Sequence, residues 1–169
     1  MQPNMQKYQL TPEEIDALLD RAPSAVISMV GEDGWPYGMP INFVRLDGKI
    51  YFHGRKVGQK MSNLERDPRC CLTVMDEGGF ERCGDMACNT TTIYESAVLL
   101  GRVVPIEDPD LKMKVLRATV DKLTPARKDD VIDPAMVPGA GVYEIVVESA
   151  TGKYHRPAEG HHLYPNHPE

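Results

Sequence analysis

The chain has 169 residues, of which 41% are hydrophobic, and this length predicts one domain with a proper core. Its formal net charge of −6 argues against non-specific binding to duplex nucleic acid or to an anionic membrane, because both are negatively charged. The sequence does not open on a signal-peptide pattern, and no apolar run approaches the roughly 20 residues that span a bilayer, so we expect a cytoplasmic protein with no membrane partner.

Residues 1–10 are expected to form a loose arm, and a helix follows them. Thr11 is typical of an N-cap, Pro12 of the first helical position, and Glu14 of a capping box. The helix is expected to end before Pro23. Its apolar residues repeat at helical spacing and predict one face packed on a sheet: Ile15, Leu18, Leu19 and Ala22.

Three strands with tight turns come next, over residues 25–30, 36–44 and 49–53. The turns are expected at residues 32–34 and 46–48. The second contains Asp-Gly, which is a strong hairpin signal. This part of the chain is therefore expected to form antiparallel hairpins.

The stretch over residues 49–69 gathers positive charge at the point where the third strand leads into a short helix over residues 58–66. It holds six Lys or Arg residues against two acids, a local charge of +4 in a chain of net charge −6: Lys49, Arg55, Lys56, Lys60, Arg66 and Arg69 against Glu65 and Asp67. A helix N-terminus attracts anions, and Gly54 and Gly58 let a ligand approach the backbone closely. The stretch predicts an anion site near Lys60; the alternative is a solvated charged loop.

The rest of the chain reads as strands separated by loops and one longer helix. The expected elements are a strand at 69–75, a Gly-rich loop at 76–89, a strand at 90–104, a helix from Pro109 to Leu123, a connector at 133–141, a strand at 142–148 that can run on to Lys153, and an irregular tail at 156–169. Strands outnumber helices and tight turns join most neighbours. We therefore predict a mainly β (α+β) domain over residues 11–155, a six-stranded antiparallel Greek-key barrel with peripheral helices.

Neither the cysteines nor the tail histidines form a known metal motif. The lack of a signal-peptide pattern predicts reduced thiols. Cys83 and Cys88 lack a matching second pair, so no metal site is predicted, and no base is placed by the sequence that would make Cys70 or Cys71 a nucleophile. A solvated tail is favoured over haem or divalent-metal binding for the four tail histidines, which are His155, His161, His162 and His167.

The order of several short motifs resembles the pyridoxamine 5′-phosphate oxidase-like family, and within it the nitroimidazole-resistance (Nim-type) subgroup. The motifs are Gly34–Phe43, Asp47–His53, Gly58-Gln59-Lys60, Asn63-Leu64 and Asp67-Pro68-Arg69. The resemblance covers Tyr8 to Gly101 and, more weakly, Val142 to Lys153. It implies a split β-barrel, a homodimer, and FMN in the cleft between the subunits.

The resemblance also implies flavin contacts at particular positions. They are Tyr37, Met39, Pro40, Ile41, Asn42, Phe52, His53, Gly58, Gln59, Lys60 and Ser96, with Lys60 at the phosphate. The chain departs from the family pattern at Gln59 and Tyr37, where basic residues are expected, so Arg55 and Lys56 are candidate substitutes. His53 is implied in activity, against the alternative of a structural histidine. Trp35 and Tyr94 are expected to pack, with a flavin face as the alternative.

The function implied is that of an FMN-dependent oxidoreductase reducing a small acceptor such as a nitroaromatic compound, with NAD(P)H as candidate donor. The substrate residues of the vitamin oxidase are not recognisable, so that reaction is not inferred. The alternative is a non-catalytic protein that stores FMN or haem or senses redox state. The positive charge over residues 49–69 is compatible with both the enzyme and the binding protein.

Overall fold

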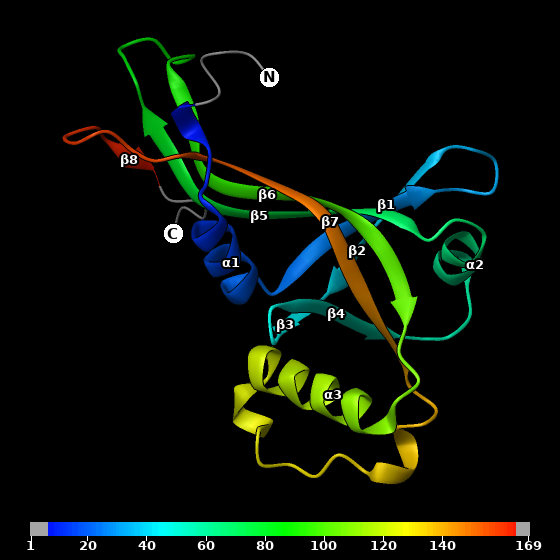
Figure 1. The fold of residues 1–169 in the computed structure, drawn as a ribbon. Helices are drawn as coiled ribbons and strands as arrows, with labels where there is room; N and C mark the ends of the chain where they lie inside the picture. The colour runs from blue at the N-terminus through cyan, green and yellow to red at the C-terminus, as the bar shows by residue number, and fades with distance from the viewer. Residues whose placement is uncertain (1–6, 165–169) are drawn as a thin grey trace.

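The computed structural model describes residues 7–164, and the expectations for residues 1–6, Pro165, His167 and Pro168 lie outside them (Figure 1). The strands are β1 (Ser24–Val30), β2 (Pro36–Asn42), β3 (Val44–Leu46), β4 (Lys49–Gly54), β5 (Arg69–Arg82), β6 (Thr90–Pro105), β7 (Gly141–His155) and β8 (Leu163–Tyr164). The helices are α1 (Pro12–Arg21), α2 (Gln59–Arg66) and α3 (Pro109–Leu123), with short 3₁₀ turns at Pro125–Arg127 and Pro134–Met136.

The strands form one antiparallel sheet in the order β2-β1-β5-β6-β7-β4-β3, with β8 added beside β5. The sheet curls until β2, at one end, comes near β4. This arrangement confirms the predicted mainly β barrel class. It adds two short strands, β3 and β8, to the six that the sequence indicates.

Local sequence signals explain the first elements. In α1 the Glu14 N–H donates to Thr11 Oγ1 at 3.2 Å, and the Thr11 N–H donates to Glu14 Oε2 at 2.8 Å, which completes the predicted capping box. Asp47 (φ 51°) and Gly48 (φ 76°) make the tight turn between β3 and β4. Both have the positive φ that this type of hairpin requires.

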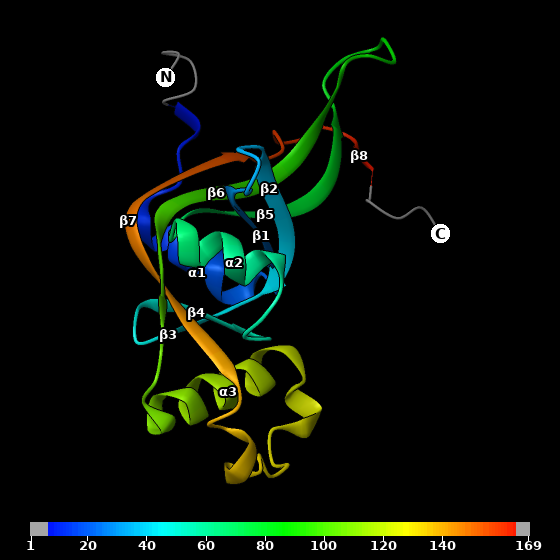
Figure 2. The ribbon, with the colours of Figure 1, turned by 90° about the vertical axis from the view of Figure 1, so that its right-hand side faces the viewer.

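Two apolar clusters hold the elements together. The larger one fills the curled sheet and includes Leu18 of α1, Met61 and Leu64 of α2, and inward residues of most strands. The smaller one joins Val115 of α3 to the outer side of β4 and β7, at Tyr51 and Val142, among others. α1 and α2 therefore cover the inside of the sheet, while α3 packs on its outside (Figure 2).

The prediction of a loop over residues 76–89 is wrong for residues 76–82, which extend β5, and is confirmed for residues 83–89, which connect β5 to β6. β5 continues to Arg82, β6 begins at Thr90, and the two strands project from the barrel as a long hairpin (Figure 1). Gly78 and Gly79 suggested irregular structure, but the strand accommodates them with a bulge between Glu77 and Gly79, where Gly79 has φ 108°. Pairing with β6 overrides the weak local strand preference.

The ends of the described chain are also more ordered than expected. Leu10 is buried, and its N–H donates to the carbonyl oxygen of Gly152 at 3.1 Å, so the last residue of the predicted arm joins the core. At the other end, β8 pairs with β5 at Phe80 and Glu81. None of the helices within residues 7–164 is both long enough and apolar enough to span a bilayer.

Candidate functional site

The N-terminus of α2 is open to an anion. Gly58 precedes the helix with φ 116°, a conformation that suits glycine, and no side chain within residues 7–164 caps the first turn. The first turn also contains no acidic residue. Backbone N–H groups that lack helical partners and the positive end of the helix dipole therefore face outwards here.

Lys60 is the cationic residue of that first turn. Its side chain is half-buried, its Nζ lies 4.8 Å from the centroid of the Phe52 ring, and burial lowers its pKa. A Cβ atom at Gly54 would lie only 3.2 Å from the same Nζ, so the ammonium rests against the end of β4. A partly desolvated ammonium without a carboxylate partner gains most from binding an anion.

The other cations of the basic stretch are mostly engaged. Lys49 pairs with Glu144 (3.1 Å), Lys56 Nζ donates to the Pro138 carbonyl (3.1 Å), Arg66 Nη2 donates to the Val30 carbonyl (2.7 Å), and Arg69 pairs with Asp67 (2.6 Å). Within residues 7–164 only Lys60 and Arg55 of the six have no hydrogen-bond or ion-pair partner, and Arg55 is exposed. Of the six cations predicted to form the anion site, these two are therefore left to bind an anion.

His53 lies next to this corner, near the end of β4. Beyond Tyr51, β4 pairs with β7 alone among the described strands, so one edge of the strand is open at Phe52 and His53. The imidazole is exposed on the single chain, yet desolvation, and then the positive charge of Lys60, lower its pKa. A neutral imidazole near pH 7 can donate or accept a hydrogen bond without adding charge.

The structure does not bring all predicted contacts together. Tyr37, Met39 and Ile41 pack inward against the core, whereas Pro40 and Asn42 lie exposed on the other side of β2, and Asn42 Nδ2 donates to the Pro23 carbonyl at 2.9 Å. Consecutive strand residues face opposite ways, so this run cannot line one surface.

Ser96 is also remote from Lys60 within one chain. At its end, β6 pairs through Pro105 with Tyr143 of β7. On its other side, Tyr143 pairs with Phe52 of β4. Ser96 lies nine residues earlier on β6, which corresponds to roughly 30 Å along the strand. We therefore expect Ser96 and Lys60 to contact one ligand only if they come from different subunits.

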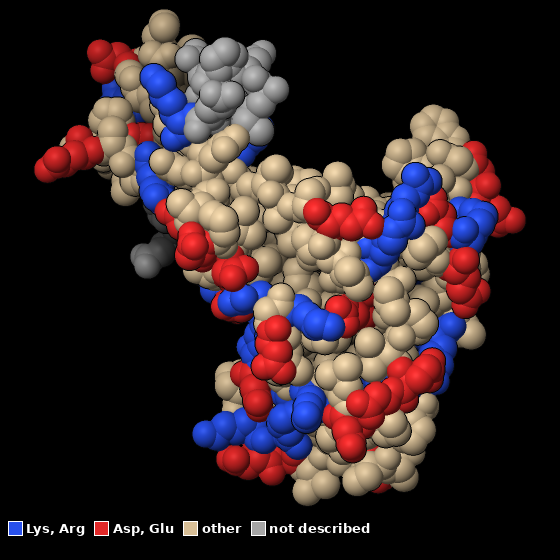
Figure 3. All heavy atoms as spheres, in the orientation of Figure 1, with Lys and Arg blue, Asp and Glu red and all other residues tan. Residues whose placement is uncertain are grey.

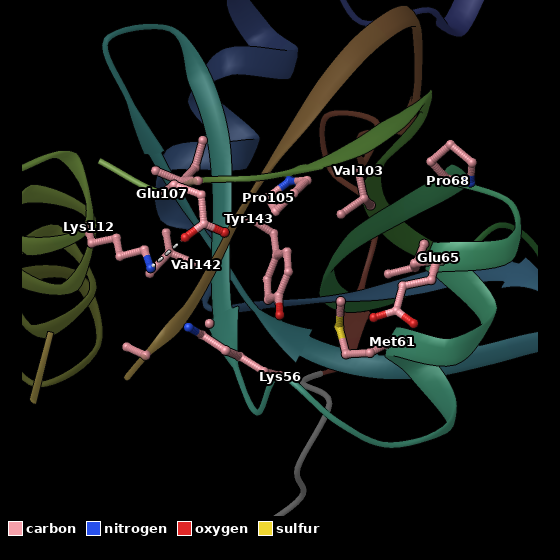
Figure 4. A pocket seen from close by; sticks show the side chains of 14 residues that line it. Lys56, Met61, Glu65, Pro68, Val103, Pro105, Glu107, Lys112, Val142 and Tyr143 are labelled. Carbon is pink, nitrogen blue, oxygen red and sulfur yellow. Dashed lines mark ion pairs between the residues drawn. The ribbon is translucent and has the colours of Figure 1, made fainter. Parts of the chain in front are cut away.

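A cavity of about 420 Å³ lies between α2 and the neighbouring ends of β6 and β7 (Figure 4). Among its lining residues are Met61, Leu64 and Glu65 of α2, Val103 and Pro105 of β6, Val142 and Tyr143 of β7, Glu107, Lys112 and Lys56. The Tyr143 ring stacks on Phe52, with centroids 5.1 Å apart. Sequence reasoning named Lys56 but missed Tyr143, because only the pairing of β7 with β4 places Tyr143 beside Phe52.

Three further residues that the sequence analysis considered lie outside this corner: Cys70, Trp35 and Tyr94. Burial raises the pKa of Cys70 to about 11, which keeps the thiol protonated and argues against a nucleophile. Trp35 is 73% exposed in the turn before β2, so the expectation that it packs is wrong for the single chain. Tyr94 is half-buried on β6, in the long hairpin.

The comparisons with known proteins agree with this architecture. A family model described as pyridoxamine 5′-phosphate oxidase matches residues 11–154. The chain belongs to this family of flavin-binding split barrels. The comparison with curated proteins gave no match.

Several solved structures share the fold. A candidate 5-nitroimidazole antibiotic resistance protein from Bacteroides thetaiotaomicron is 25% identical, with a TM-score of 0.72 over 86% of this chain and 85% of that one. The flavocytochrome Anf3 from Azotobacter vinelandii is 26% identical, with a TM-score of 0.78 over 92% and 72%. An FAD- and haem-binding protein from Mycobacterium smegmatis is 23% identical, with a TM-score of 0.76 over 95% and 77%.

Proposed function

We propose that this chain binds FMN, with the flavin phosphate at the junction of β4 and α2, and acts as an FMN-dependent oxidoreductase. The observation that carries the proposal is the half-buried Lys60 ammonium, which has no carboxylate partner among residues 7–164 and lies in the uncapped first turn of α2. A phosphate dianion needs both charge and directed N–H donors, and this corner offers both.

The donor set fits one phosphate group better than a diphosphate. Lys60 and the first turn of α2 make a single compact anion site, and Arg55 is the one other cation of the basic stretch that has no partner in the described chain. This favours FMN over FAD, although one of the similar structures is named for FAD. Parallel titrations with FMN and FAD distinguish the two cofactors.

For the reaction, we propose the reduction of a small nitroaromatic acceptor, with NAD(P)H as electron donor. The similarity to the candidate nitroimidazole resistance protein supports this choice. A bound flavin supplies hydride and electron transfer, and the protein supplies position and hydrogen bonds. His53, exposed at the open end of β4 beside Lys60, is the side chain proposed to contact the flavin or the acceptor.

A homodimer is part of this proposal, because the single chain leaves apolar surface uncovered. Val26 of β1 and Val98 and Leu100 of β6 are 39–50% exposed on the outer side of the sheet, next to Cys71 and Thr73 of β5. We call these five residues the outer patch. Figure 3 shows uncharged surface over the middle of β5 and β6. A second subunit on this patch would also bring Ser96 of one chain towards a cofactor held by the other.

The test is the absorption spectrum of the purified protein before and after NADPH, followed by a 5-nitroimidazole. Flavin absorbance that NADPH bleaches and the nitro compound restores supports the enzyme. A bound flavin or haem that no pyridine nucleotide reduces supports the alternative, a storage or redox-sensing protein. A protein that takes up no flavin contradicts both forms of the FMN proposal.

A further inference from the structure

Glu81, near the end of β5 in the long hairpin, is an almost fully buried carboxylate. Its side chain is 2% exposed and all its described partners come from the chain beyond β7 or from the end of β7 itself. His155 Nε2 lies 2.5 Å from Oε2, the Ala158 N–H donates to Oε1 at 2.8 Å, and His161 Nδ1 contacts Oε1. Residues far apart in the sequence therefore meet on one carboxylate.

Cys83 completes the cluster. Cys83 directly follows the last residue of β5 and lies two positions after Glu81, a spacing that places both side chains on the same side of an extended chain. A carboxylate oxygen of Glu81, Cys83 Sγ and a ring nitrogen of His161 all lie within 4.8 Å of one another. A carboxylate oxygen, a thiolate and an imidazole nitrogen are the three donor types that protein-bound zinc uses.

We infer that Glu81, Cys83 and His161 bind a divalent transition-metal ion of the zinc type, with His155 holding the free carboxylate oxygen. The sulfur and nitrogen donors exclude a site built for Ca²⁺ or Mg²⁺, which prefer oxygen ligands. His155 stands in the position of an outer hydrogen-bond partner, which fixes the orientation of a ligand. Both histidines contact the Glu81 carboxylate, in contrast to the sequence-based expectation that His155 and His161 belong to a solvated tail.

Such an ion would fasten the C-terminal segment to the hairpin. Besides Glu81, that segment is held by the Arg82 N–H, which donates to the His162 carbonyl at 2.9 Å, and by the two-residue strand β8. Little apolar surface is buried there, since Phe80, Leu163 and Tyr164 are all exposed. In Figure 1 this hairpin and α2 lie at different ends of the molecule, so the metal site stands apart from the proposed flavin corner.

The experiment uses untagged full-length protein, titrated with Zn²⁺ by calorimetry and with Co²⁺ by absorption. One equivalent of metal should bind, and Co²⁺ should give a thiolate charge-transfer band. Cys83→Ser should abolish that band, His161→Gln should greatly weaken Zn²⁺ binding, and His155→Gln should weaken it roughly tenfold to a hundredfold. The matched controls are Cys88→Ser, an exposed cysteine of the same loop, and His162→Gln, whose ring packs on Tyr164.

X-ray absorption of the Zn²⁺-loaded wild-type protein gives a result that does not depend on any variant folding. One sulfur ligand with nitrogen and oxygen ligands supports the site, whereas a shell without sulfur overturns it. The inference is also overturned if no stoichiometric metal binds, or if Cys88→Ser removes the Co²⁺ band as Cys83→Ser should. In those cases Glu81 only holds the C-terminal segment by hydrogen bonds from His155, Ala158 and His161.

Discussion

The Lys60 ammonium lies 4.8 Å from the centroid of the Phe52 ring, where the last residues of β4 face the first turn of α2. The ring gives the ammonium a weak cation–π contact, which does not replace the water lost on burial. The lowered pKa of Lys60 expresses that imbalance. A bound phosphate would compensate the ammonium for the lost water. Removing the charge of Lys60 should therefore lower the affinity for FMN but raise the stability of the flavin-free protein.

Lys60→Met should weaken FMN binding by about 1.5–3 kcal/mol, roughly 10- to 150-fold, because a hydrogen bond to a charged group is lost. Fluorescence titration of FMN measures the change. Lys56→Met is the matched control, since Lys56 is already bound to the Pro138 carbonyl and should change the affinity little. Equal losses in the two variants would show that general positive charge, rather than Lys60, attracts the phosphate.

The same variant should stabilise the flavin-free protein. Burial lowers the pKa of Lys60 below its ordinary 10.5, so the unfolded chain binds this proton more tightly than the folded one. The stability of the folded state should therefore rise as the pH increases through the lowered pKa towards 10.5, and Lys60→Met should remove this rise. Thermal unfolding at a series of alkaline pH values tests this, and a lower melting temperature for Lys60→Met at neutral pH would contradict it.

FMN affinity should depend on pH in the opposite direction. Charged Lys60 binds the phosphate, so affinity should fall as the pH rises through the pKa of this lysine, below 10.5. Affinity measured between about pH 7 and pH 10 should fall for the wild-type protein and stay nearly flat for Lys60→Met. Parallel curves for the two proteins would place the titrating group elsewhere.

Gly54→Ala tests the position of the ammonium. The added Cβ would lie 3.2 Å from Nζ, and the flexible lysine would have to move away from the end of β4. We expect FMN affinity to fall severalfold in this variant, whereas Gly54→Ala should cause little further loss in a protein that already carries Lys60→Met, because both changes act on one contact. Additive losses in this double-mutant cycle would mean that Gly54 acts independently of Lys60.

A second set of charges supports the barrel itself. Glu95 of β6 accepts hydrogen bonds from Arg21 of α1 (2.5 Å) and from Arg156 after β7 (2.9 Å). Burial raises the pKa of Glu95, but the bonds from the two arginines outweigh it and hold the pKa below 4.5. This contribution to stability should be lost as the pH falls from 4.5 through the lowered pKa.

Glu95→Gln should accordingly cost about 1 kcal/mol of unfolding free energy at neutral pH, and less in acid. Urea unfolding at neutral and acidic pH measures both values. A loss that is the same at the two pH values would show that packing, rather than charge, explains the effect.

Leu100→Arg should disrupt the proposed dimer, because it puts a charge into the outer patch, where Leu100 is 50% exposed on the single chain. Light scattering should find a monomer that binds FMN more weakly, since Ser96 could then no longer complete the cofactor site from the other subunit. Val131→Arg, at an 89% exposed position in the segment after α3, should leave the oligomeric state unchanged. A monomeric wild-type protein would contradict the proposal.

Features encoded over a few residues could be predicted from the sequence. The Thr11–Glu14 capping box, the Asp47-Gly48 turn and the concentration of charge around Lys60 all depend on neighbours in the chain. The long hairpin could not be predicted in this way, because β5 beyond Met75 is held by pairing with β6 rather than by local preference. The contacts of Tyr143 with Phe52 and of His161 with Glu81 join residues about 80–90 positions apart, and no short-range pattern encodes them.

A crystal structure of the protein grown with FMN would show directly whether the β4–α2 junction holds the flavin phosphate. We expect a phosphate oxygen within hydrogen-bond distance of Lys60 Nζ and of the first N–H groups of α2. A flavin whose phosphate lies elsewhere, with Lys60 still resting on Phe52, would overturn the assignment of this junction.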